Sequence, residues 1–184
     1  MTMELVGKRM QLLKEMLPRA RRVAVIAFPQ HAGDQNERRV SEAAAATLGM
    51  TLEYFEARNS DEIATALAQI EKSRNEAVMM FPVQNVIAGR ERIAQWSIRN
   101  RIPTISGWAQ FAEGGNLMSY GPNLRAATNR LAYFVDRILK GAKPADLPVE
   151  QPVRVEFVVN ARTAKALGIT IPPVVLLRAD RVIE

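Results

Sequence analysis

A set of amide, hydroxyl and aromatic side chains follows the apolar runs of this sequence that have the length of strands. The set consists of Gln30, Gln84, Asn85, Ser106, Trp108, Phe111, Tyr120 and Asn123. If the runs form a parallel sheet, these side chains gather at its carboxyl edge, where open sheets bind ligands. Amides form hydrogen bonds and aromatic rings stack, so the set suits a small planar or zwitterionic molecule. We expect these residues to bind a ligand, and we expect Trp108 and Asn85 to share one pocket.

Each of these residues also has a purely structural interpretation. Trp108 and Phe111 could pack beneath a loop, and Asn85 and Asn123 could cap helices. The types of the residues do not distinguish between packing, capping and ligand contact.

Residues that could catalyse a reaction are isolated in the sequence. His31 is the sole histidine, and no Gly-x-Ser-x-Gly motif accompanies it. Gly114 and Gly115 match neither the dinucleotide fingerprint nor the phosphate loop, so they indicate a turn. The carboxylates of Asp34, Glu37 and Glu113 are scattered and are expected on the solvated surface. The sequence therefore predicts no catalytic residue, no cofactor and no metal site.

The composition is that of an ordinary globular protein, with 184 residues, 48% hydrophobic and 24% charged. The net charge of +6 permits contact with nucleic acid. The basic residues are scattered, however, and no nucleic-acid-binding motif accompanies them, so we expect no such partner. No apolar run approaches the length of a membrane span, and residues 1–14 have the pattern of an amphipathic helix, not of an export signal. Made as written, the chain would be cytoplasmic.

Strands and helices alternate along the first two thirds of the chain. Buried or half-buried strands are predicted at 23–28, 51–57, 77–83 and 104–108, and helices up to residue 17 and at 34–48, 60–72 and 86–100. Such alternation is typical of right-handed βαβ units. The fold class is therefore α/β, a parallel sheet with helices on both faces.

The pattern changes after residue 115. A short strand at 117–120 precedes a helix at 123–140 that carries an apolar stripe, and prolines then favour an extended connector up to Pro152. Residues 153–159 alternate as a strand, residues 161–167 form a short helix, and Pro172 and Pro173 begin a tail.

The carboxyl half contains the segments that identify a family. They are Leu-Met-Ser-Tyr-Gly-Pro-Asn at 117–123, Tyr-Phe-Val-Asp-Arg-Ile-Leu-Lys-Gly-Ala-Lys-Pro from 133, Val-Glu-Phe-Val-Val-Asn at 155–160 and Thr-Ala-Lys-Ala-Leu-Gly-Ile-Thr-Ile-Pro-Pro at 163–173. With these segments the chain resembles the substrate-binding proteins of ABC transporters related to tryptophan and tyrosine uptake. Residues 7–15 and 22–25 are similar to the same family. The loop at 28–34 departs from it, because the family usually has Asn-Pro and then a Pro-Gly-Ser-like turn there.

The resemblance implies a periplasmic-binding-protein fold of the first type, in which two α/β lobes enclose a small organic ligand, such as an aromatic amino acid. This chain would be about the last three fifths of such a protein. Residues 1–121 would form a second-lobe-like domain, residues 122–152 a helix and connector that pack on a first lobe, and residues 153–184 a returning strand, short helix and tail. The implied partner is a membrane permease, and the implied location of the full-length family is periplasmic or extracytoplasmic.

Three further expectations follow from this arrangement. Without a first lobe, the helix at 123–140 could form a homodimer, because its apolar stripe needs a partner. A stand-alone cytoplasmic sensor or regulator of the same fold is an alternative function. A small α/β enzyme is a second alternative, which would need a convergent acid, base or nucleophile at the sheet edge.

Overall fold

The computed structural model describes residues 4–150 and 154–184, and within them a single seven-stranded sheet organises the chain. The strands lie in the order β2-β1-β3-β4-β5-β6-β7. Their bounds are β1 (Arg22–Ala27), β2 (Thr51–Glu56), β3 (Ala77–Met80), β4 (Thr104–Ser106), β5 (Met118–Pro122), β6 (Val155–Asn160) and β7 (Arg181–Ile183). The five strands from β2 to β5 are parallel, β6 runs antiparallel to β5, and β7 is parallel to β6.

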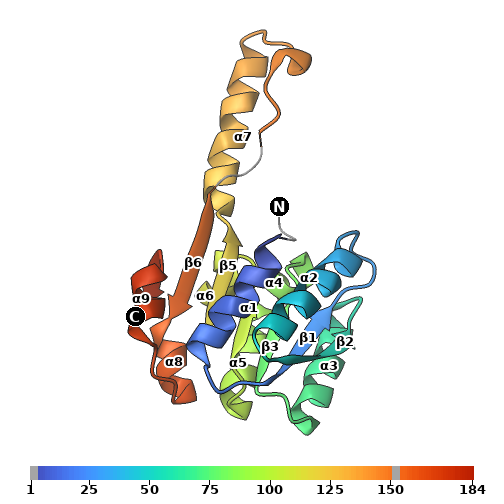
Figure 1. Cartoon of the computed structure of the whole chain (residues 1–184). Coiled ribbons are helices and arrows are strands. Elements are labelled where there is room, and N and C mark those ends of the chain that lie inside the picture. Colours follow the sequence, from blue (N-terminus) through green and yellow to red (C-terminus); the bar gives the residue numbers. More distant parts are fainter. Residues whose placement is uncertain (1–3, 151–153) are drawn as a thin grey trace.

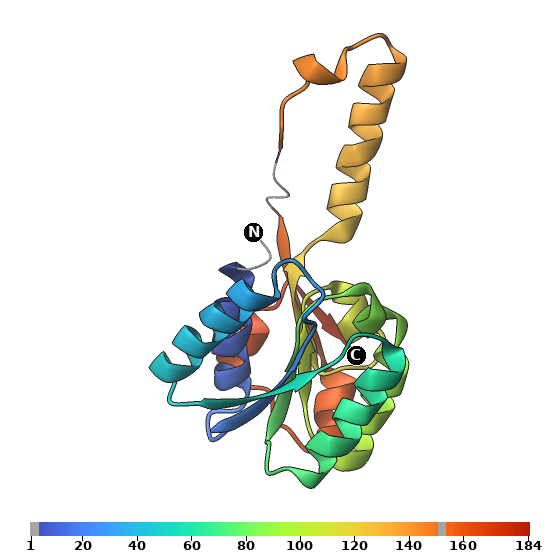
Figure 2. The same ribbon diagram turned by 90° about the vertical axis from the view of Figure 1, so that its right-hand side faces the viewer.

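Helices cover both faces of the sheet (Figures 1 and 2). Their bounds are α1 (Glu4–Met16), α2 (Asp34–Thr47), α3 (Ser60–Lys72), α4 (Gln84–Ala88), α5 (Arg90–Asn100), α6 (Ala109–Glu113), α7 (Leu124–Leu139), α8 (Ala161–Leu167) and α9 (Pro173–Arg178), with a 3-10 turn at Pro144–Asp146. Helices α1, α2 and α9 lie on one face, and α3, α5 and α8 on the other. The chain therefore has the layered architecture that its βα alternation predicts.

The central strands are apolar because both of their faces are covered. Five of the six residues of β1 and all four residues of β3 are buried. Strand β2 lies at the edge of the sheet, and its residues are exposed or half-buried. A continuous apolar run inside and a mixed sequence at the edge is the pattern expected of a covered parallel sheet.

Helix α7 departs from this compact arrangement. It projects away from the body at the end of β5, and the chain returns to the sheet through β6 (Figure 1). None of the residues of α7 is buried, although the helix carries several large apolar side chains. Leu131 is 62% exposed and Leu139 is 82% exposed. An amphipathic helix whose apolar stripe lies in solvent lacks the surface on which it would normally pack.

The structure differs from the sequence-based predictions in three regions. The helix predicted at 86–100 is two helices, α4 and α5, because the chain breaks at Gly89, a residue with low helix propensity. The predicted tail contains α9 and β7, since Pro173 occupies the first turn of a helix, where its missing N–H is not needed. Helix α6 was not predicted. The beginning of the first helix and residues 151–153 of the predicted connector and strand lie outside the described residues.

Candidate functional site

The carboxyl ends of β1, β3, β4 and β5 lie at one edge of the sheet, on the side from which α7 projects (Figures 1 and 2). The side chains that the sequence singles out lie at the ends of these strands or in the loops and short helices that follow them. Gln30 and Gln84 are exposed to solvent there. Both amides are therefore open to solvent at this edge.

Asn85 and Trp108 are partly exposed at the same edge. The Asn85 Nδ2 donates a hydrogen bond of 3.4 Å to the carbonyl oxygen of Arg58, so it joins α4 to the loop before α3. Trp108 immediately precedes α6. Of the two hollows described below, the larger is lined by Asn85 and neither is lined by Trp108. That these two residues share a pocket stays a prediction.

Tyr120 and Asn123 lie where the chain leaves the body. The Tyr120 ring packs edge-on against Phe157, with 6.3 Å between the ring centroids. Asn123 caps α7, because its Oδ1 accepts a 2.8 Å hydrogen bond from the backbone N–H of Ala126. Its Nδ2 donates to Glu156 over 2.9 Å. The capping interpretation of Asn123 is therefore correct, and its role toward a ligand stays a prediction.

Ser106 and Phe111 lie beneath the edge, and their contact with a ligand stays a prediction. Neither has any exposed surface. The Ser106 hydroxyl donates a 3.0 Å hydrogen bond to the carbonyl oxygen of Met80, which ties β4 to β3. Phe111 points into the core from α6. Both residues support the edge from beneath and offer no surface to a ligand in this structure.

A buried charged cluster beneath the edge was missed by the sequence analysis. Arg9 of α1 and Glu37 of α2 are 0% and 1% exposed. The Arg9 Nε donates a 2.8 Å hydrogen bond to the carbonyl oxygen of Tyr120. No described residue forms a hydrogen bond with its two terminal nitrogens or with the Glu37 carboxylate oxygens. His31 Nδ1 lies 3.7 Å from the Glu37 carboxylate and extends the cluster to the surface.

Burial dominates the ionisation of this cluster. It raises the pKa of Glu37 from 4.5 to about 7, although the nearby Arg9 charge opposes the shift. It lowers the pKa of Arg9 from its ordinary value to about 10. The expectation that Glu37 lies on the solvated surface is therefore wrong. It is wrong for Asp34 too, since Asp34 is 5% exposed and accepts the backbone N–H of Phe28 over 2.9 Å. The sequence did contain one sign that Asp34 and Glu37 are not scattered. They are three residues apart, and this spacing places both carboxylates on one face of a helix.

Two hollows occur on the surface near these elements. A groove of about 320 Å³ runs between α3 and α5, and a smaller hollow of about 180 Å³ lies at the base of α7 beside Asn123. Glu113, which lines the smaller hollow, is exposed and pairs with Arg181, as a surface carboxylate should. In the part of the chain that the structure describes, no group of three or more His, Asp or Glu side chains is placed to hold a metal ion.

The family model of the ABC transporter substrate binding proteins matches residues 2–183 of this sequence. The chain belongs to this family. No sequence among the curated proteins matches it. None of the helices within residues 4–150 and 154–184 is long and apolar enough to cross a membrane.

Solved structures resemble this family member over most or nearly all of its length. A conserved domain protein from Vibrio cholerae is 25% identical over 96% of this chain and 60% of its own, with a TM-score of 0.84. An ABC domain from Streptococcus pneumonia, solved in complex with L-Trp, is 24% identical over 97% of this chain and 62% of its own, with a TM-score of 0.83. An amino acid ABC transporter substrate-binding protein from Pseudomonas fluorescens shares the fold at a TM-score of 0.53, with 18% identity over 78% of this chain and 42% of its own.

These likenesses confirm the predicted fold class, a mostly parallel α/β sheet of the periplasmic-binding-protein kind. This substrate-binding family member spans about 60% of the length of the first two solved relatives. The part that those relatives have in addition is large enough to be a further lobe.

Proposed function

We propose that this chain is the second lobe of an ABC-transporter solute-binding protein and that it holds a small organic ligand at the carboxyl edge of its sheet. The observation that carries the proposal is the course of α7. The helix leaves the body at that edge and has no buried residue, and β6 brings the chain back. A first lobe packed on α7 would face the exposed amides and Trp108 across a cleft.

The proposed ligand class is an aromatic amino acid. The Streptococcus pneumonia relative was solved with L-Trp, and this is the support from outside the chain. Within the chain, Trp108 offers a ring for stacking, and Gln30, Gln84 and Asn85 offer amide groups that suit a zwitterion. Such a site binds and releases its ligand, so we propose no catalysis. By the same family membership, the complete protein would act outside the cytoplasm and deliver its ligand to a membrane permease.

The first test is an NMR titration of the ¹⁵N-labelled chain with L-tryptophan. A lobe that carries half of the cleft should bind L-tryptophan weakly, at the carboxyl edge of the sheet. We expect the amide signals of Gln30, Gln84 and Trp108 to shift in a saturable way. Asn85→Ala and Trp108→Ala should each weaken the effect, whereas Gln95→Ala on the solvent side of α5 should leave it unchanged.

Two results of this titration would contradict the proposal. One is the absence of any shift at the carboxyl edge at high ligand concentration. The other is a set of shifts confined to the opposite end of the sheet, where the amino ends of the parallel strands lie.

A further inference from the structure

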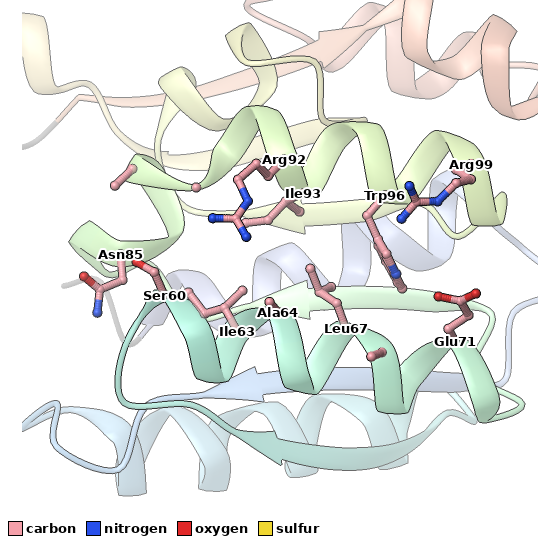
Figure 3. A pocket seen from close by; sticks show the side chains of 13 residues that line it. Ser60, Ile63, Ala64, Leu67, Glu71, Asn85, Arg92, Ile93, Trp96 and Arg99 are labelled. Atoms are coloured by element: carbon pink, nitrogen blue, oxygen red, sulfur yellow. The ribbon is translucent and has the colours of Figure 1, made fainter.

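A groove between α3 and α5 lies on the face of the sheet opposite α1 (Figure 3). Its volume of about 320 Å³ is at the lower end of the range for small-molecule sites. The two helices can leave this space because small residues line it. They are Ala64, Ala68, Ala88 and Gly89. The apolar walls come from larger side chains. They are Ile63, Leu67, Ile93 and Trp96.

Trp96 lines this groove and carries a buried, unsatisfied donor. The side chain leaves α5 and enters the space between the helices, beside Leu67 (Figure 3). The residue is 5% exposed, and no described residue accepts a hydrogen bond from its indole N–H. Buried donors nearly always have a partner, because an unpaired one keeps the full cost of its desolvation. An acceptor in the groove would remove this cost when the Trp96 ring turns its buried N–H toward the groove.

The charge of the groove favours an anionic acceptor. Arg92 and Arg99 lie one helical turn before and after Trp96 on the same stripe of α5, and both guanidinium groups reach over the groove (Figure 3). Neither forms an ion pair with any residue that the structure describes. Glu71 is the sole carboxylate among the lining residues. Two cations therefore face one anion.

We propose that this groove is a second ligand site, which takes a small carboxylic acid with an apolar body. The body packs between Ile63 and Leu67, and the carboxylate accepts hydrogen bonds from the Trp96 N–H and from the arginines. The site lies along the sides of α3 and α5, and only its end at Asn85 reaches the carboxyl edge of the sheet. It does not depend on the ligand proposed for the cleft.

The test uses phenylacetate as the probe and phenylacetamide as its uncharged control. The chain has two tryptophans, so its ¹⁵N spectrum should contain two indole N–H signals, and a Trp108→Phe spectrum assigns them. We expect phenylacetate to shift the Trp96 indole signal downfield in a saturable way, as a new charge-assisted hydrogen bond does. The amide should bind about tenfold more weakly, since it offers a neutral acceptor.

Matched variants locate the site. Ala68→Leu places a large side chain in the groove and should abolish the shift, whereas Gln69→Leu on the next, outward position of α3 should not. The double variant Arg92→Gln, Arg99→Gln should weaken binding by at least about tenfold. Arg74→Gln removes an exposed arginine outside the groove and should have no effect.

Any of three results would overturn this inference. The groove is not a carboxylate site if the Trp96 indole signal stays in place, if phenylacetamide binds as well as phenylacetate, or if Ala68→Leu binds like the parent chain. Should Ala68→Leu fail to fold, Ala64→Leu fills the same groove one turn earlier. Shifts at Trp108 alone would indicate binding at the carboxyl edge and would count against this site without affecting the proposed function.

Discussion

The substitution Glu37→Gln should make the protein more stable at neutral pH and should remove a large part of its pH dependence. In the folded chain the Glu37 carboxyl keeps its proton up to about pH 7, because burial raises its pKa from 4.5. In the unfolded chain the same group ionises near its ordinary value. Between pH 4.5 and about 7, ionisation of Glu37 stabilises the unfolded state but not the folded state.

The size of this effect follows from the shift of the pKa. One unit corresponds to about 1.36 kcal/mol, so a rise from 4.5 to about 7 corresponds to roughly 3 kcal/mol. Below pH 4.5 the group is protonated in both states and contributes no difference. The free energy of unfolding should therefore fall by about 3 kcal/mol as the pH rises from 4.5 to 7, and it should stay low above that. A glutamine amide does not ionise in this range, so the substitution removes the fall.

Urea unfolding across this pH window is the assay. The parent chain and Glu37→Gln should be about equally stable at the acid end, and the variant should be more stable by about 3 kcal/mol at the neutral end. Several charged groups surround Glu37: Arg9 from α1, His31 from the loop before α2, and Asp34 within α2. His31→Gln controls for the charge of the histidine, and Glu42→Gln, at an exposed position of the same helix, controls for the loss of one carboxylate.

Parallel stability curves of the parent chain and the variant would refute the reasoning. A variant that is less stable at neutral pH would refute it in a more informative way. That result would mean that the attraction between ionised Glu37 and Arg9 outweighs the desolvation of the carboxylate.

Three further predictions concern other parts of the fold. Gly121→Ala should lower the free energy of unfolding by more than about 3 kcal/mol, measured in urea, because its Cβ would overlap the backbone carbonyl of Gly107, which cannot move aside. The chain should self-associate through α7, since burial of each exposed aliphatic side chain is worth about 1.5–3 kcal/mol. Light scattering should detect a dimer, and Leu131→Glu and Val135→Glu should abolish it. A monomer at high concentration would contradict this prediction. Calorimetry should find weak or undetectable affinity for any amino acid, because half a cleft buries a ligand on one side only, and sub-micromolar binding would show that a first lobe is not needed.

The sequence predicts the layers of this fold well because each layer depends on a local pattern. The run at 23–28 is apolar since β1 is covered on both faces, and the alternating helices follow from spacing alone. Helix α9 and strand β7 have six and three residues, which are too few to show a period. They form because tertiary contacts select them, including the ion pair between Arg178 and Glu15 of α1.

The candidate site was harder to predict than the fold. The sequence locates the ends of the strands, and Gln30, Gln84, Asn85 and Trp108 do lie at the expected edge with exposed surface. It does not determine which side chains at that edge point inward, and so it could not show that Ser106 is buried. Charged residues on amphipathic helices are usually solvated, so burial of Arg9 and Glu37 requires knowledge of how α1 packs on α2 and on β5.

The course of α7 also has a mechanical consequence. The helix has 16 residues and is about 24 Å long, so a rotation of roughly 10° at its base displaces its tip by about 4 Å. Its base is attached to a stiff ladder, in which β5 pairs with β6 from Met118 to Pro122 and the N–H of Asn123 donates to the carbonyl oxygen of Arg154. Gly121 packs directly on Gly107, which adds a fixed support behind the ladder. Any rotation of α7 relative to the sheet should therefore occur in the residues beyond the Asn123–Arg154 hydrogen bond. The β5–β6 ladder itself should stay in place.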